Sequence, residues 1–181
     1  MSDIRVAHRY ALAAISVAEE MNIVDIVSKD FALVEKMFVD IRDFGIFMKS
    51  PVIHTEKKKT VLTNVLRGNI HDFTLKFILL LTSRGREAVL RDVCKEFYRL
   101  RDVRRGILNV SARATVTFTD EQRRQLIHQI EQVTKKTVHL NVELDTSLQG
   151  GFTVQYEDTV WDASVRHQLE ILRQRFVEGT I

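Results

Sequence analysis

The sequence predicts an α + (α+β) protein, with an N-terminal bundle of six helices over residues 1–105 and a small α+β domain over residues 106–181. Only 1 proline and 7 glycines occur among 181 residues, which favours long uninterrupted helices over a β-sandwich. Near Gly106 the hydrophobic pattern changes from helical spacing to strand-like alternation. The charge changes as well, because residues 1–106 carry 19 Lys and Arg against 14 Asp and Glu, whereas residues 107–181 carry 8 against 10. Two modules with different partners are therefore expected.

Six helices are expected in the first domain, at residues 2–21, 22–45, 46–49, 55–67, 73–84 and 86–104. In the second of them, for example, Ile23, Ile26, Val27, Val34, Met37, Phe38 and Ile41 recur at helical spacing. Thr55 and Asp72 are expected to cap the fourth and fifth helices, and Pro51 must break the chain before the fourth. The fourth helix is expected to place three lysines outside and four apolar residues inside: Lys57, Lys58 and Lys59 against Val61, Leu62, Val65 and Leu66.

Two helices of this domain carry more than one ordinary apolar stripe. The first has small residues at spacings of 4, 3 and 4, which let another helix approach closely (Ala7, Ala11, Ala14 and Ala18). The fifth is apolar nearly all round between Phe73 and Leu81. A peripheral helix needs only one apolar face, so the fifth helix is either central in the bundle or one wall of an exposed groove. Periodicity alone leaves both alternatives open.

The second domain is expected to run β-α-β-β-β-α. A strand at residues 109–117 precedes Thr119-Asp120-Glu121-Gln122, a capping box. It starts a helix carrying Leu126, Ile127, Ile130 and Val133. Residues 138–144 alternate as a half-buried strand, and residues 152–156 and 160–161 form a hairpin. Gly150-Gly151 is expected to permit a positive φ or a close backbone approach. Asp162 or Ser164 then caps a final helix, whose apolar residues are Val165, Leu169, Leu172 and Phe176.

No group of residues has the spacing of a catalytic or metal site. The histidines are scattered, and Gly150-Gly151 is not followed by the Lys-Ser/Thr of a phosphate loop. Asp158 and Asp162 flank the hairpin, where turn and cap roles are common. Cys94 is the single cysteine, so no internal disulfide is possible. We expect no cofactor and no metal, no secretory leader, and no apolar run of the ~18 residues that span a bilayer.

Several motifs resemble the delta subunit of bacterial F-type ATP synthase, the counterpart of the mitochondrial oligomycin-sensitivity-conferring protein. Residues 5–13, Arg-Val-Ala-His-Arg-Tyr-Ala-Leu-Ala, are similar to the opening of that family. Ser50-Pro51 before a lysine-rich helix, and Arg84-Gly85-Arg86 after the fifth helix, resemble two further segments. The strongest resemblance is Leu148-Gln149-Gly150-Gly151-Phe152, together with Asp162-Ala163-Ser164 and Leu169. The resemblance covers the whole chain, with Trp161 and Ala163 as departures.

This resemblance implies a non-catalytic stator subunit that couples proton-driven rotation to ATP synthesis. It implies that the first domain binds the N-terminal helices of the alpha subunits and that the second binds the b subunits of the peripheral stalk. It also implies a peripheral location on the cytoplasmic face of the bacterial plasma membrane, with membrane association only through the complex. The alpha helix would dock between the first and fifth helices, on Ala7, Tyr10, Ala11, Ala14, Phe73, Lys76, Phe77 and Leu80. Structural roles in the second domain would fall to Gly150, Gly151, Phe152, Asp162, Ser164 and Leu169.

Two other functions are compatible with parts of the sequence. A small nucleic-acid-binding protein would explain the pI of about 9.1 and the clusters Lys57-Lys58-Lys59 and Arg104-Arg105. These clusters lack interleaved exposed aromatic residues and a nucleic-acid motif, so solvated helix faces explain them better. An enzyme with its site near Asp158 and Asp162 would need a convergent set of reactive groups, which the sequence lacks.

Overall fold

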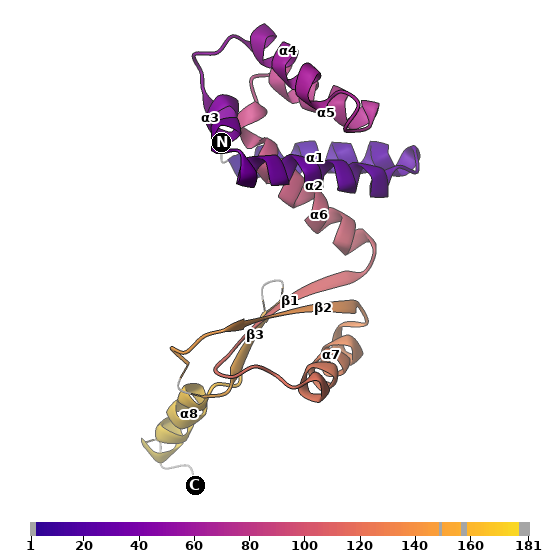
Figure 1. Ribbon diagram of the computed structural model, residues 1–181. Helices are drawn as coiled ribbons and strands as arrows, with labels where there is room; N and C mark the ends of the chain where they lie inside the picture. The colour runs from indigo at the N-terminus through magenta and orange to yellow at the C-terminus, as the bar shows by residue number, and fades with distance from the viewer. Residues whose placement is uncertain (1–2, 149, 157–158, 178–181) are drawn as a thin grey trace. The chain divides into compact units, whose positions relative to one another are not determined.

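The computed structural model describes residues 3–148, 150–156 and 159–177. The chain divides into two compact units, residues 1–101 and 102–181, and each is considered by itself (Figure 1). The division falls inside α6 (Leu90–Arg104), a few residues before the boundary expected at 105/106. Each unit has its own apolar cluster, and a hydrophobic core of its own is what a domain needs in order to fold independently.

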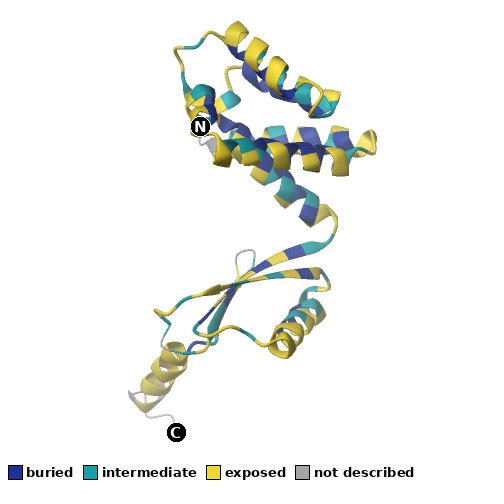
Figure 2. Ribbon diagram, viewed as in Figure 1, coloured by how far each residue is buried: buried dark blue, intermediate teal, exposed yellow. Residues whose placement is uncertain are grey.

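The first unit contains helices only among the residues that the structure describes. They are α1 (Asp3–Glu20), α2 (Val24–Asp40), α3 (Arg42–Lys49), α4 (Thr55–Leu66), α5 (Asp72–Ser83), the 3-10 turn η1 (Glu87–Val89) and α6. Their inner faces share one core, which Figure 2 shows as the dark inner sides of the ribbons. Aromatic rings lie at its centre, where the Phe31 ring meets that of Phe97 edge to face at 4.9 Å. Phe31 also lies 6.0 Å from Phe77, so α2, α5 and α6 meet there.

Three expected helix boundaries in this unit are wrong. The second helix ends at Asp40 rather than near Gly45, because Ile41 adopts an extended conformation and α3 begins directly after it. The fifth helix is capped by His71, whose Nδ1 accepts a hydrogen bond from the Phe73 backbone at 3.2 Å, and Asp72 is its first helical residue. Thr55 is likewise the first residue of α4, after a His54 that makes no side-chain cap.

The inward face of α4 differs from the expected one. Lys58 is 2% exposed, and Leu62 and Leu66 follow it at intervals of four residues on the same buried face. Val61 and Val65, expected inside, are exposed. The Lys58 Nζ lies 2.5 Å from Glu87 Oε1 and 3.2 Å from the Met48 carbonyl. A buried ammonium requires such partners, and this pair therefore joins α4 to η1 and α3.

The second unit is a four-stranded mixed sheet with a helix on one face. The strands β1 (Ile107–Ala114), β2 (Thr137–Leu144), β3 (Phe152–Tyr156) and β4 (Thr159–Asp162) lie in the order β2-β1-β3-β4. Strands β1 and β2 are parallel, as a helical crossover through α7 (Asp120–Thr134) requires. Strand β3 pairs antiparallel with both β1 and β4. The order of elements agrees with the expected β-α-β-β-β-α pattern.

Helix α7 covers the side of the sheet that carries the apolar residues. Its capping box is confirmed, since the Thr119 side chain accepts from the Gln122 backbone at 3.2 Å and the Gln122 side chain accepts from the Thr119 backbone at 3.0 Å. Leu126 and Ile130 are buried against the sheet. Val133, another apolar residue of the expected helix, is 79% exposed.

The two consecutive glycines join three parts of the second unit. Gly151 has a φ of +81°, and a Cβ there would lie 2.3 Å from the Ala163 carbonyl oxygen. The Gly151 carbonyl accepts from the Thr115 backbone, just beyond β1, and the Gly150 carbonyl accepts from Val165, the first residue of α8 (Val165–Val177). Both expectations for this pair, a positive φ and a close backbone approach, are met.

Candidate interaction surfaces

The small residues of α1 form part of the core. Ala7, Ala11, Ala14 and Ala18 are at most 2% exposed, so their side chains offer no surface to a partner of the folded chain. Small side chains let neighbouring helices of the same unit lie close to α1, and they serve that purpose here. The side chains of Ala7, Ala11 and Ala14 are therefore covered in the folded unit, and the docking groove expected on them stays a prediction.

Most side chains of helix α5 are buried or half-buried in the first unit, and only a narrow face of the helix is exposed to solvent. Phe77, also expected in the groove, is 8% exposed, and Ile78 and Leu81 are fully buried. The remaining groove residues lie toward solvent, since Phe73 is half-buried, Lys76 is exposed and Leu80 is 47% exposed. Of the two alternatives for this apolar helix, central burial accounts for most of its surface.

A buried carboxylate fixes the start of α5 against α2. Asp30 is 7% exposed, and its Oδ2 accepts hydrogen bonds from the His71 backbone at 2.9 Å and from the Thr74 hydroxyl at 2.6 Å. Thr74 is itself fully buried. A carboxylate that receives two donors at a helix N-terminus is favoured by the helix dipole. The outer side of α5 is therefore held in a defined orientation.

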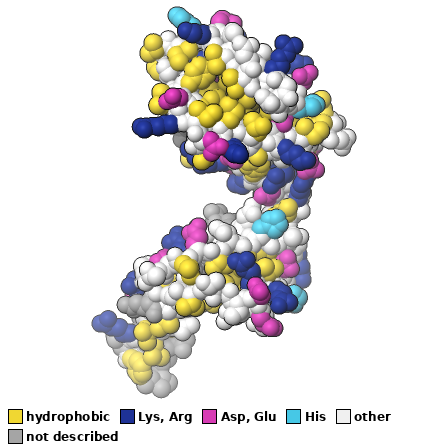
Figure 3. All heavy atoms as spheres, viewed as in Figure 1, with side chains coloured by type: hydrophobic (Ala, Val, Ile, Leu, Met, Phe, Trp, Pro, Cys, Tyr) yellow, Lys and Arg dark blue, Asp and Glu magenta, His cyan; other side chains and the backbone are white. Residues whose placement is uncertain are grey.

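The solvent-facing part of the expected groove on α1 is smaller than expected, and we add one further residue to it. Tyr10 is half-buried against the core, and Val17, seven residues further along α1, is on the same side and 39% exposed. The turn η1 contacts both α1 and α5. We call Tyr10, Val17, Phe73, Lys76 and Leu80 the α1/α5 surface. Figure 3 shows apolar side chains gathered on one face of this unit.

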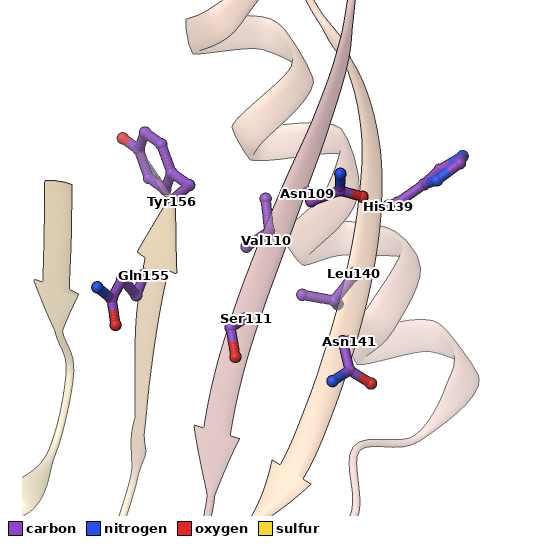
Figure 4. A pocket seen from close by; sticks show the side chains of 8 residues that line it. All are labelled: Asn109, Val110, Ser111, His139, Leu140, Asn141, Gln155 and Tyr156. Carbon is purple, nitrogen blue, oxygen red and sulfur yellow. The ribbon is translucent and has the colours of Figure 1, made fainter. Parts of the chain in front are cut away.

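The second unit leaves the sheet face opposite α7 open. In β1 every second residue faces the core, and the alternate ones, Asn109, Ser111 and Arg113, are exposed. A shallow hollow of about 300 Å³ lies over β1, β2 and β3, with Asn109, Ser111 and Asn141 among its lining side chains (Figure 4). Short polar side chains on the outer face are usual for a sheet that is covered on one side. This hollow brings together no catalytic group of acid, base and nucleophile.

An apolar groove beside α7 was missed in the sequence. The rings of Phe118, Phe152 and Trp161 form an edge-to-face series with centroid distances of 5.5 Å and 6.4 Å. Next to it lies a cavity of about 360 Å³, lined by Ile130, Val133, Tyr156 and Trp161 and by two glutamines of α7. The signal that could have revealed it is Trp161, the single tryptophan of the chain, in a short strand where it is 46% exposed.

Helix α8 presents its apolar residues to solvent. Leu169, Leu172 and Phe176 are 56%, 50% and 63% exposed, although their spacing is that of a helix that buries one face. The start of the helix is firmly built, because Ser164 Oγ accepts from the His167 backbone at 3.3 Å. Asp162 Oδ1 accepts from the Ser164 backbone at 2.8 Å, and the hydrogen bonds from Ser164 lower the pKa of the Asp162 carboxyl. Ser164 is therefore the cap, and Asp162 forms the turn before it.

The described residues offer little reactive chemistry. Cys94 is fully buried, and burial raises the pKa of its thiol well above the ordinary value, which keeps it protonated and unreactive. Asp158, which with Asp162 would form the acid pair of an enzyme, lies outside the described residues. Within the described ranges no three His, Cys, Asp or Glu side chains converge as metal ligands would.

Comparison with known proteins decides the family. A family model described as "ATP synthase delta (OSCP) subunit" matches residues 6–176. The chain belongs to this family. The ATP synthase subunit delta of Chlorobium phaeobacteroides is 38% identical over 178 residues, covering 98% of this chain and 99% of the relative. That of Chloroherpeton thalassium is 36% identical over 176 residues, covering 97% and 96%.

A solved structure shares the fold. A chain of the Toxoplasma gondii mitochondrial ATP synthase hexamer superposes with a TM-score of 0.69 at 21% identity, covering 94% of this chain and 97% of that one. Membership of the family makes the chain a non-catalytic stator subunit of ATP synthase. The nucleic-acid-binding alternative receives no support from these comparisons.

None of the described helices combines the length and the apolar character that crossing a membrane requires.

Proposed function

We propose that this subunit ties the catalytic head of ATP synthase to its peripheral stalk through two separate surfaces. The first unit binds the N-terminal helices of the alpha subunits, and the second binds the b subunits. A stator built this way resists the torque of the rotor, so that proton-driven rotation changes the catalytic sites instead of turning the head. In a bacterium the subunit would lie on the cytoplasmic face of the plasma membrane, held there by the complex.

The observation that carries the proposal is the exposed apolar stripe of α8. Val165, Leu169, Leu172 and Phe176 lie on one side of the helix and are each at least 40% exposed. Full burial of one such side chain in an interface contributes ~1.5–3 kcal/mol of favourable free energy. An amphipathic helix of this kind is suited to packing against another helix, which is the form expected of a stalk end.

The first unit offers a second, smaller surface of a similar kind. The α1/α5 surface combines two aromatic residues with Leu80, Val17 and the ammonium of Lys76. The expected alpha helix would lie across this outer surface, because the alanine stripe of α1 is already filled by the chain itself. A partner helix would then present an apolar stripe toward Tyr10 and Leu80, with polar residues at its margins.

The test uses the full chain with isolated head and stalk subcomplexes. Leu172→Asp places a charge in the α8 stripe and should abolish stalk binding while leaving head binding intact. Gln174→Asp adds the same charge on another side of α8 and serves as the control. Leu80→Asp should give the reverse pattern, with head binding lost and stalk binding retained. If Leu172→Asp and Gln174→Asp bind the stalk equally well, α8 is not the stalk contact.

A further inference from the structure

Three arginines converge on one hollow at the outer side of α1. Arg5 and Arg9 are one helical turn apart, and Arg86 follows the C-terminal end of α5, where its backbone N–H donates to the Leu81 carbonyl at 2.9 Å. Together with Val6 and Tyr10 they line a cavity of about 230 Å³. We call Arg5, Arg9 and Arg86 the arginine pocket.

No acidic side chain among the described residues is paired with an arginine of the arginine pocket. All three side chains are exposed, and none has a hydrogen-bond or ion-pair partner among the residues that the structure describes. Two arginines of the same unit differ in this respect, since Arg99 bonds Glu96 at 2.7 Å and Arg101 lies 5.1 Å from the centre of the Tyr98 ring. Glu87, the acid next to Arg86, is bonded to Lys58.

This arrangement does not favour the stability of the isolated chain. Three like charges around one cavity repel each other, and Arg5 lies in the first turn of α1, where the helix dipole disfavours a cation. An anion in the cavity would reverse both effects. Guanidinium groups match a carboxylate especially well, because each can offer two parallel N–H donors.

We infer that the arginine pocket binds a side-chain carboxylate of the helical segment that docks on the first unit. The inference rests on the proposed function and adds a charged anchor to it. Tyr10 lines the pocket and is also part of the α1/α5 surface, so an acidic residue at the end of a docked apolar stripe would reach the arginines. The half-buried Val6 and Tyr10 give the cavity an apolar wall that suits the aliphatic stem of Glu better than a free inorganic ion.

Charge reversal in the full chain tests this inference. Arg9→Glu and Arg86→Glu should each weaken binding of the catalytic head by about tenfold or more, and the loss should shrink as salt rises because screening weakens the contact in the wild type. Arg84→Glu is the matched control, since Arg84 is exposed and two residues from Arg86 but does not line the pocket. Circular dichroism and thermal unfolding would verify that each variant is folded.

The outcomes separate this inference from the proposed function. If the wild-type chain fails to bind the head, the proposed function fails and this inference with it. If the wild type binds and both reversals bind as tightly as Arg84→Glu at every salt concentration, only the arginine pocket is refuted. Restored binding when an acid of the head's N-terminal helix is changed to Lys, in the presence of Arg9→Glu, would establish the contact. Inorganic phosphate that shifts the Arg9 and Arg86 NMR signals without displacing the head would instead mark a small-anion site and overturn the inference.

Discussion

At the scale of single residues, Gly151 is the position where the backbone tolerates least change. Its φ of +81° disfavours any residue with a Cβ, and the Ala163 carbonyl oxygen occupies the place where that Cβ would lie. Gly106 has a φ of +66° but open space around it. Substituting Gly106 therefore measures the cost of backbone strain alone, whereas substituting Gly151 measures strain together with a steric clash in the same unit.

Gly151→Ala should destabilise the second unit by several kcal/mol, whereas Gly106→Ala should cost about 1–2 kcal/mol, the strain alone. The single tryptophan, Trp161, lies in β4, so its fluorescence during urea unfolding reports this unit. Equal effects of the two substitutions would show that the backbone around Ala163 yields to the added Cβ. Stalk binding should fall with Gly151→Ala while head binding persists.

The buried pair of Lys58 and Glu87 gives a second prediction at this scale. Glu87→Ala removes the counter-charge of Lys58, which is 2% exposed, and should destabilise the first unit by about 3–5 kcal/mol. The double variant Lys58→Met with Glu87→Leu removes both charges and should recover most of that loss. Chemical unfolding followed by circular dichroism measures both. A double variant as unstable as Glu87→Ala would mean that the ion pair itself stabilises the fold.

At the scale of secondary-structure elements, α1 is joined to α6 by a pair of titratable groups. His8 Nδ1 lies 2.6 Å from Glu96 Oε1, and Arg99 bonds both oxygens of Glu96. The hydrogen bonds from Arg99, followed by that from His8, lower the pKa of the Glu96 carboxyl in the folded state. This contact connects helices that lie far apart in sequence, so its titration affects their packing.

A lowered pKa in the folded state means that ionised Glu96 stabilises the fold. That contribution is complete above the ordinary carboxyl pKa of 4.5 and is lost as the pH falls below it through the lowered folded-state value. Glu96→Gln should therefore lower stability at pH 7 and flatten the loss of stability below about pH 4.5. Unfolding free energies measured between pH 3 and pH 7 provide the comparison. An unchanged acid dependence would show that other carboxylates dominate it.

At the scale of the whole molecule, two cores are joined by one continuous chain segment. The compact units meet within α6, and each contains a separate apolar cluster. A two-core stator subunit can engage two partners without either interface requiring the other. Each surface variant described above should therefore affect one partner only.

Residues 1–106, which include all of α6, should fold alone and keep a helical circular-dichroism signal with a cooperative thermal transition. The reason is that, within the part of the chain that the structure describes, the core of the first unit ends at Leu100. The fragment should bind the head and not the stalk. A fragment that melts without cooperativity would show that the first core depends on the second unit.

The sequence by itself determined the order and type of the elements, because periodicity, caps and breakers act locally. The capping box at Thr119 and the hairpin after Gly151 were predicted in this way. The family motifs are also short and local, so they could be recognised from the sequence alone. Only the tertiary structure decided which faces are covered, because burial depends on segments distant in sequence. Periodicity marked both the alanines of α1 and the stripe of α8 as contact faces, but packing filled the first with the chain's own helices and left the second exposed. The prediction that Lys58 faces solvent was wrong for the same reason, since its partner Glu87 lies 29 residues away in the sequence.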